Sequence, residues 1–417
     1  MRDRETFDKL TAHIDKLEPD MVEMQRELVR RPAVSPRSGG TGERDKVDYL
    51  RPVLEGWGLR VTEYRAPDEC APGGYRPSLV ARLEGKSPSP ALWIMTHLDV
   101  VPSGPRELWD TDPFEAVVKD GRIYGRGTED NQQEMVASAF AVKAMLDLKV
   151  VPERDVCLML VADEEVGSKL GVDWLLRNAD LCRPQDLVVV PDAGNEDGTM
   201  LEVAEKSIAW VKFTVKGSQV HASTPDKGKN AHRVGANIIV RLDEFLHAKY
   251  GVRDELFAPP VSTMEPTRKE ENVPNINTVP GEDVFWFDCR MLPPYRLEDL
   301  LADMRAKAGE VAAAFGAEVT LETDQLVQAP AATPVGSPVV RMLAQAVKAV
   351  YGKDATPKGI GGGTVASFFR RRGIPTVVWG RFTGRAHQPN EYCLIDNMRD
   401  DAKVYAWMAG ADGQDRG

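Results

Sequence analysis

The sequence predicts an α/β protein in which a discontinuous domain, with a mostly parallel sheet flanked by helices, is interrupted by a smaller α+β domain. The chain has 417 residues, more than one hydrophobic core usually serves, so two domains are expected. Near both ends of the chain, continuous apolar runs alternate with helical patterns, whereas in the middle apolar and polar residues alternate. We therefore assign residues 1–206 and 326–417 to the first domain and residues 207–325 to the second.

The first part of the chain supplies most of the predicted parallel sheet. Apolar residues recur at helical spacing over residues 7–30, which predicts a helix. Continuous apolar runs at 91–95, 155–162 and 187–190 are typical of strands buried on both faces. Residues 134–148, rich in Ala, Met and Leu, predict a helix between the first two of these strands. Buried strands separated by helices indicate a sheet with helices on both sides.

The middle of the chain has a different pattern. Residues 210–217 alternate apolar and polar side chains, as a half-exposed strand does. Together with later patterns they predict a β-α-β-α-β unit, with the remaining elements at 231–247 (helix), 284–291 (strand), 297–315 (helix) and 318–323 (strand). The first pattern then returns, with a helix at 337–351, a Gly-rich loop at 359–363, a helix near 365–372 and a strand at 376–379.

Composition and charge exclude several functional classes. The net charge is −11, which argues against a nucleic-acid partner, since such a partner requires a basic face. No apolar run approaches the length of a membrane span, and the charged N-terminus lacks the apolar core of a signal peptide. The five cysteines are scattered and form no CxxC pair, so neither a disulfide framework nor a cysteine zinc site is expected. These features predict a cytoplasmic protein.

Several acidic residues and histidines stand where predicted strands end. His97 ends a buried strand, and Asp99 is expected on the same face, where its carboxylate could fix the tautomer of a metal-bound imidazole. Asp130 follows a Gly-rich turn and precedes a helix, which suits either a metal ligand or a helix N-cap. Glu164 and Glu165 follow the strand at 155–162; an acidic run is usually a solvated loop, but a buried strand ending here favours a ligand site.

Asp192 and His387 complete this set of candidates. Each follows a predicted strand, as His97 and Glu165 do. For any one of these positions, a structural role such as a buried, capped histidine competes with metal binding. Two histidines with three carboxylates, however, form a ligand set for divalent ions, and one carboxylate, such as Asp130, can bridge two metals. The coincidence of five such positions is far more specific than any single motif.

Seven segments carry a resemblance to a known family. The chain resembles the dinuclear zinc hydrolases that include succinyl-diaminopimelate desuccinylase, acetylornithine deacetylase, aminoacylase and glutamate carboxypeptidase. The matching segments follow the family's order and are THLDVVPSG (96–104), GRIYGRGTEDNQQ (121–133), DEEVGS (163–168), VVPDAG (189–194), VKGSQVHASTPDKGKNA (215–231), FDCRMLP (287–293) and HQPNEY (387–392).

The resemblance implies two divalent metal ions per chain, Zn²⁺ first, with Co²⁺ or Mn²⁺ as alternatives. His97 and Asp192 would hold one ion, Glu165 and His387 would hold the other, and Asp130 would bridge them. The first domain would then be the catalytic domain. The inserted domain would be a lid that also forms a homodimer interface.

The resemblance also assigns catalytic and substrate-binding roles. Glu164 would be the general base, and Asp99 would orient the first histidine ligand. His221 would reach the active site of the neighbouring subunit and stabilise the oxyanion, although alone it reads as a surface histidine. Arg290 would bind a substrate carboxylate, although without the resemblance it would be interpreted as a charge at a strand edge facing water. Asn277 would contact the substrate.

Two departures from the family pattern bear on the substrate. Asn131-Gln132-Gln133-Glu134 stands where the family commonly has a Lys-Gly pair. The Gly-rich loop with Gly362 and Gly363, expected to bind substrate, lacks an acidic residue that the family often carries.

The implied reaction is hydrolysis of an amide bond in an N-acyl amino acid, as in a desuccinylase or deacetylase. A metallo-carboxypeptidase or dipeptidase acting on short peptides is the alternative. An aminopeptidase fits less well, because Arg290 indicates recognition of a free carboxylate. A metal-binding protein without catalysis is disfavoured by Glu164, since such a protein needs no base beside its ligands.

Overall fold

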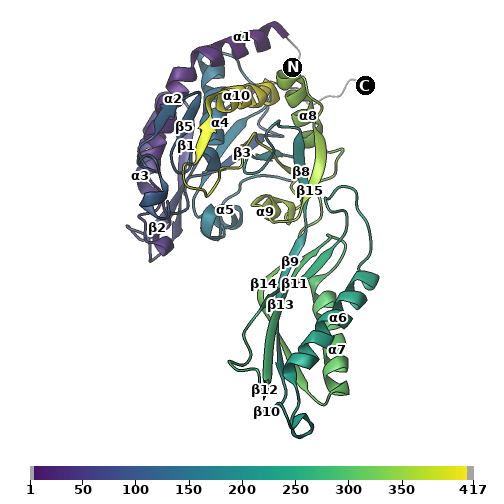
Figure 1. Cartoon of the computed structure of the whole chain (residues 1–417). Coiled ribbons are helices and arrows are strands. Elements are labelled where there is room, and N and C mark those ends of the chain that lie inside the picture. The colour runs from purple at the N-terminus through teal and green to yellow at the C-terminus, as the bar shows by residue number, and fades with distance from the viewer. Residues whose placement is uncertain (1–3, 411–417) are drawn as a thin grey trace. The chain divides into compact units, whose positions relative to one another are not determined.

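The computed structural model describes residues 4–410, and the chain divides into two compact units (Figure 1). Within the described range, unit 1 consists of the residues up to Val203, of Thr333–Pro357 and of the residues from Phe368 onward. Unit 2 consists of Ala204–Ala332 and Lys358–Ser367. The Gly-rich loop therefore belongs to unit 2, whereas the sequence assigned it to the first domain.

Most of an eight-stranded sheet lies in unit 1. In spatial order its strands are β1 (Arg60–Pro67), β2 (Tyr75–Leu83), β6 (Val156–Val161), β3 (Leu92–His97), β7 (Leu187–Val190), β16 (Thr376–Val378), β8 (Met200–Glu205) and β15 (Thr356–Ile360). The four central strands β6, β3, β7 and β16 run parallel to one another. Antiparallel pairs flank them, β1 with β2, β2 with β6 and β16 with β8. The sheet strands predicted from continuous apolar runs are confirmed, and β3, β6 and β7 are buried along their whole length.

Eight of the described α-helices lie wholly or partly in unit 1, and several of them pack against this sheet. The eight are α1 (Arg4–Lys16), α2 (Glu18–Val29), α3 (Arg44–Gly56), α4 (Gln133–Asp147), α5 (Val172–Asn178), α8 (Pro338–Tyr351), α9 (Ala366–Arg370) and α10 (Ile395–Gly410). Helix α4 contacts β3 and β6, α8 contacts β7 and β16, and α10 packs on both α4 and α8. The single helix predicted over 7–30 is wrong, because the chain breaks at Leu17 between α1 and α2. Pro19, in the first turn of α2, has no N–H to continue a helix and clashes with the preceding turn.

A small three-stranded sheet also belongs to unit 1. Its order is β17 (Tyr392–Leu394), β5 (Arg122–Tyr124) and β4 (Val117–Lys119). Strand β17 pairs with β5 antiparallel, so Tyr392 lies opposite Tyr124. This pairing joins two segments far apart in the sequence, and each segment carries a candidate metal ligand.

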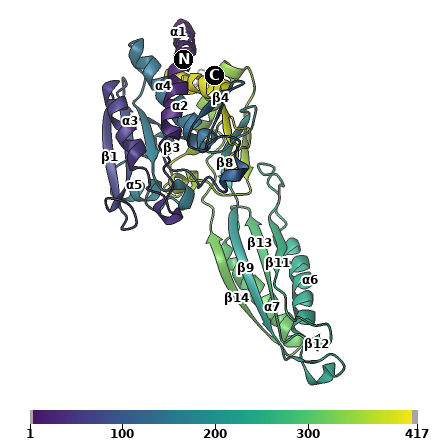
Figure 2. The same cartoon turned by 60° about the vertical axis from the view of Figure 1, so that its left-hand side comes forward.

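Unit 2 is a four-stranded antiparallel sheet with two helices on one face (Figure 2). The sheet order is β11 (Thr263–Lys269), β13 (Glu282–Met291), β9 (Ser207–Lys216) and β14 (Glu318–Val327), and the helices are α6 (Ala231–Lys249) and α7 (Leu297–Ala314). Burial alternates along β9 as predicted, and Phe213 stacks on Phe285 in the core beneath the helices. The edge strand β11 was not predicted, because Pro266 interrupts its ladder and most of its side chains are exposed.

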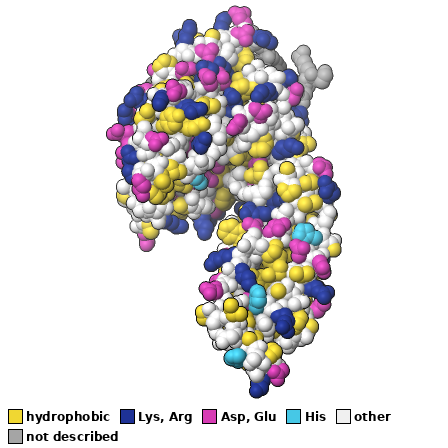
Figure 3. All heavy atoms as spheres, viewed as in Figure 1, with side chains coloured by type: hydrophobic (Ala, Val, Ile, Leu, Met, Phe, Trp, Pro, Cys, Tyr) yellow, Lys and Arg dark blue, Asp and Glu magenta, His cyan; other side chains and the backbone are white. Residues whose placement is uncertain are grey.

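The surface of the described residues mixes both charges. Figure 3 shows basic and acidic side chains interspersed over the visible face. None of the helices within residues 4–410 is long and apolar enough to cross a membrane. All five cysteines are free thiols.

Candidate metal centre

The five predicted ligands form two groups that share one residue. His97, Asp130 and Asp192 make up the first group, and Asp130, Glu165 and His387 make up the second. Within each group, one ligand atom from every residue lies within 4.8 Å of the others. Asp130 is thus the common member, as a bridging carboxylate must be.

The central parallel strands of unit 1 bring four of these residues to one edge. His97 is the last residue of β3, Glu165 follows β6, Asp192 follows β7 and His387 lies in the loop after β16. Because these strands are neighbours and run in the same direction, their carboxyl ends meet at one edge of the sheet. Asp130 arrives from the turn between β5 and α4.

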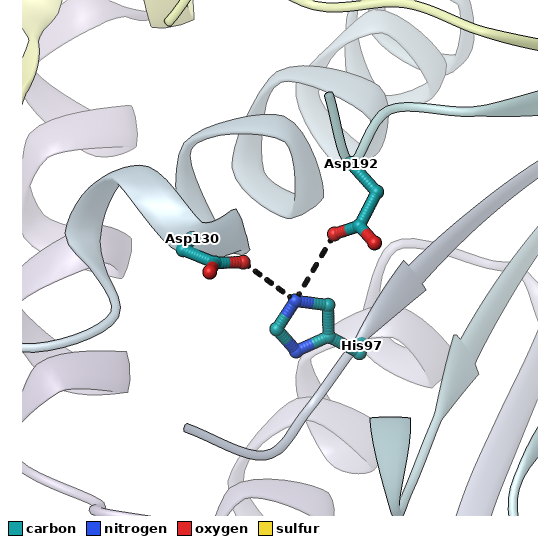
Figure 4. A group of neighbouring side chains, drawn as sticks. All are labelled: His97, Asp130 and Asp192. Carbon is teal, nitrogen blue, oxygen red and sulfur yellow. Dashed lines mark hydrogen bonds and ion pairs between the residues drawn. The ribbon is translucent and has the colours of Figure 1, made fainter. Parts of the chain in front are cut away.

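The ring of His97 is held between carboxylates and a carbonyl group. Its Nε2 lies 2.9 Å from Oδ1 of Asp130 and 3.3 Å from Oδ1 of Asp192 (Figure 4). Its Nδ1 donates to the backbone carbonyl of Asp99 at 2.9 Å, since a carbonyl oxygen can only accept. A proton fixed on Nδ1 leaves the Nε2 lone pair of the neutral ring available to a metal.

Asp99 therefore orients the histidine differently from the sequence-based expectation. The carboxylate of Asp99 is 3.8 Å from Nδ1 of His97, and it accepts hydrogen bonds from the backbone N–H groups of Glu164 at 3.0 Å and Glu165 at 3.1 Å. Asp99 thus connects the end of β3 to the turn that carries both glutamates. Burial, together with the charge of Glu43, raises the pKa of Asp99 to about 7.

The second histidine faces the other oxygen of the shared carboxylate. Nε2 of His387 lies 3.0 Å from Oδ2 of Asp130 and 3.1 Å from Oε2 of Glu165. These hydrogen bonds raise the pKa of His387 to about 10. Burial works to lower the pKa of His97. The hydrogen bonds and charges of Asp130 and Asp192 outweigh this effect and hold the pKa well above its usual value.

This donor set fits divalent metal ions. Burial works to raise the pKa of Asp130, but the hydrogen bonds with His387 and His97 outweigh it and lower the pKa. The carboxylate is therefore ionised, and each imidazole donates a hydrogen bond to it through an N–H proton. A divalent cation at the same atoms would replace those protons, because metal ligands are deprotonated carboxylates and neutral imidazoles. Glu164 stands beside the groups, and burial together with the repulsion of Asp192 raises its pKa well above the usual value.

Two residues that support the site were not identified from the sequence. The side chain of Asn131 accepts from the backbone N–H of His97 at 3.1 Å and donates to Asp192 at 3.0 Å. Lys46, fully buried in α3, donates to the backbone carbonyl of Leu98 at 2.7 Å. The position of Asn131 next to a predicted ligand was a usable signal, whereas nothing around Lys46 in the sequence indicates its role.

His221 and Asn277 are neighbours within unit 2. The short strands β10 (Val220–His221) and β12 (Thr278–Val279) pair with each other, and the N–H of Ala222 donates to the carbonyl of Asn277 at 2.8 Å. Nδ1 of His221 accepts from the N–H of Ser223 at 3.1 Å. The proton of the neutral ring is then on Nε2, which leaves an exposed imidazole able to donate.

Arg290 is also in unit 2, with its guanidinium already engaged. It makes a bidentate contact with Asp288, at 2.6 Å and 3.0 Å, and donates to the carbonyl of Gly361 at 3.1 Å. These bonds use three of the five N–H donors of the side chain. Gly362 and Gly363 follow in the Gly-rich loop, and a Cβ at either would meet no atom closer than 3.6 Å, so space alone does not require glycine there.

Comparison with known proteins agrees with the motifs. Residues 93–410 match the model of peptidase family M20/M25/M40. The chain belongs to this family. An uncharacterized metallohydrolase of Methanococcus maripaludis is 37% identical over 93% of this chain and 97% of its own length. Succinyl-diaminopimelate desuccinylase of Rhodospirillum centenum is 29% identical over 94% of this chain and 99% of its own.

The fold is also similar to that of solved structures. A tripeptidase from Staphylococcus aureus superimposes with a TM-score of 0.71, covering 95% of this chain and 98% of its own, at 21% identity. The chain is therefore a metallohydrolase of the M20/M25/M40 family, with two groups of candidate metal ligands.

Proposed function

We propose that this metallohydrolase cleaves the amide bond of an N-acyl amino acid, in the manner of a desuccinylase or deacetylase. The observation that carries the proposal is the pair of ligand groups joined at Asp130, with Glu164 beside them. The similarity to desuccinylases over nearly the whole chain supports this substrate class. Cleavage of a di- or tripeptide is the second candidate, supported by the similarity to a tripeptidase fold.

His97 and Asp192 would hold one ion, Glu165 and His387 the other, and Asp130 would bridge both. Zn²⁺ is the proposed metal, with Co²⁺ or Mn²⁺ as alternatives, because mixed imidazole and carboxylate ligands suit all three. Ions held there would supply Lewis-acid polarisation of the amide carbonyl and activation of water.

In the proposed reaction, Glu164 is the residue that transfers protons. Burial and the repulsion of Asp192 raise its pKa, which makes the carboxylate a stronger proton acceptor. Glu164 takes a proton from the attacking water and delivers it to the leaving amine. The carboxylate of Asp99 accepts a hydrogen bond from the backbone N–H of Glu164 and thereby fixes the turn that carries the base.

Unit 2 would supply the contacts to the substrate. His221, through Nε2–H, would donate to the oxyanion, and Arg290 would bind a free carboxylate with its remaining N–H groups. Asn277, Gly362 and Gly363 would line the substrate site. By resemblance to the family, His221 would act on the site of a second copy of the chain, which predicts a homodimer formed through unit 2.

A substrate panel tests the proposal. Zn²⁺-loaded protein is assayed with N-succinyl and N-acetyl amino acids, dipeptides and tripeptides, each with a free or an amidated C-terminus. N-acyl amino acids with a free carboxylate should give the highest kcat/KM. Preference for peptides would favour the second candidate, and indifference to the carboxylate would contradict the role of Arg290.

A further inference from the structure

Two buried glutamates lie close to candidate metal ligands in the sequence. Glu129 directly precedes Asp130, and Glu391 lies four positions after His387. Their exposed fractions are 1% and 0%. A buried carboxylate is costly unless hydrogen-bond donors surround it, so the donors around each one are informative.

Glu391 binds the segment that carries Asp130. One oxygen accepts from the backbone N–H groups of Glu129 at 3.0 Å and Asp130 at 3.1 Å. The other accepts from the N–H of Gly127 at 3.0 Å and from the guanidinium of Arg126 at 2.6 Å. The pairing of β17 with β5 brings Glu391 to this segment.

Glu129 binds the segment that carries His387. One oxygen accepts from the backbone N–H of Thr383 and from its hydroxyl, the latter at 2.6 Å. The other accepts from the N–H of Arg385 and from that of Ala386 at 3.0 Å. His387 is the next residue along the chain.

We propose that Glu129 and Glu391 form a reciprocal clasp. The carboxylate of Glu391 positions the loop that carries Asp130, and the carboxylate of Glu129 positions the loop that carries His387. Glu391 fixes the backbone at Asp130, and Glu129 fixes the backbone that leads into His387. The clasp sets the separation between these two ligands, and therefore the affinity for the metal ion that both of them hold. The inference rests on the proposed metal site.

Glutamine at either position breaks the clasp with little change in shape. Both oxygens of each carboxylate accept hydrogen bonds, so an amide NH₂ group must face N–H donors in either orientation. The Glu129→Gln variant should loosen the His387 loop and weaken the ion held by Glu165 and His387. The ion held by His97 and Asp192 should be retained.

The experiment measures metal binding without an assay of activity. Zn²⁺ is titrated into apo-protein against a chromophoric chelator, and Co²⁺ absorption follows the two sites in turn. Wild type should bind two ions. Glu129→Gln should bind one as tightly as wild type and the other about 10–100-fold more weakly, as is typical when a partner of a metal ligand is lost. Glu391→Gln, which acts on the shared Asp130, should weaken both ions.

Milder variants and a control separate positioning from loss of folding. Thr383→Val removes one donor to Glu129 and should weaken the binding of the ion held by Glu165 and His387. Thr383→Ser keeps the hydroxyl and should retain wild-type affinity. Asp186→Asn is the matched control: this buried carboxylate accepts from Ala91, Trp93 and Arg183, in hydrogen bonds that include no metal ligand. Its variant should lower the melting temperature and leave Zn²⁺ affinity unchanged.

The outcomes distinguish the clasp from the proposed metal site. If wild type binds two ions and Glu129→Gln binds both with unchanged affinity, the clasp is refuted while the metal site stands. If Thr383→Val and Asp186→Asn lower metal affinity equally, Glu129 is a structural residue only. If wild type does not bind two ions, the metal site and the clasp both fail.

Discussion

The buried Lys46 gives a prediction that can be tested on metal-free protein. Burial lowers the pKa of Lys46 from its ordinary value of 10.5 to about 8, although Asp99 and Glu43 act in the opposite direction. Between pH 8 and 10.5 the unfolded chain therefore holds a proton that the folded chain has released. Stability must rise with pH across this window, because the unfolded state binds more protons.

The magnitude follows from the two values. The difference between 10.5 and about 8 corresponds to about 3 kcal/mol in the free energy of unfolding. This contribution is fully present above pH 10.5 and is lost as the pH falls through 8. Lys46→Met cannot titrate, so wild type should gain about 3 kcal/mol relative to this variant between pH 7.5 and 10.5.

Urea denaturation followed by circular dichroism measures this difference at several pH values. Titrations shared by both proteins cancel. Lys46→Gln, which also removes the charge but keeps a donor for the Leu98 carbonyl, should show the same pH-dependent difference from wild type. A difference between wild type and Lys46→Met that stays constant from pH 7.5 to 10.5 would show that the pKa of Lys46 is not lowered by folding. So would a wild type that loses stability relative to the variant as the pH rises.

Three further predictions concern catalysis. Glu164→Gln should lower kcat by about 10²–10⁴-fold with both ions retained, as elemental analysis can check; loss of metal here, with retention in Glu165→Gln, would exchange the roles of the two residues. His221→Ala should lower turnover by about 10²–10³-fold, and mixing it with Glu164→Gln under subunit exchange should restore activity; mixed dimers that stay inactive would exclude donation between subunits. Arg290→Met should lower kcat/KM about 10–100-fold for substrates with a free carboxylate and should leave their amides unaffected; an equal loss for both would assign the side chain a structural role.

The sequence predicted the parallel sheet because continuous apolar runs are a local signal. Strands β3, β6 and β7 followed from such runs, and the candidate ligands followed from polar residues at their ends. The order of the strands was not predicted, but parallel strands that are neighbours bring their carboxyl ends to one edge, so residues at those ends lie together. Four of the five predicted ligands are brought together for this reason, and the fifth, Asp130, comes from the turn between β5 and α4.

Contacts between distant segments could not be predicted in this way. Glu391 and the N–H group of Glu129 are 262 positions apart, and no pattern around either residue names its partner. The hydrogen bond between Asp99 and His97 was likewise not predicted. The strand ends at His97, and it is the backbone carbonyl of Asp99 that accepts from the imidazole, while the carboxylate of Asp99 lies 3.8 Å from Nδ1.

Metal content is the direct test of whether two metal ions share Asp130. Elemental analysis of purified, Zn²⁺-loaded wild type should give two ions per chain. Asp192→Ala and Glu165→Ala should each retain one ion, because each removes a ligand of a single group. Asp130→Ala should lose more metal than either, since both groups include it. Two ions per chain in Asp130→Ala would show that Asp130 does not bridge the two metal ions.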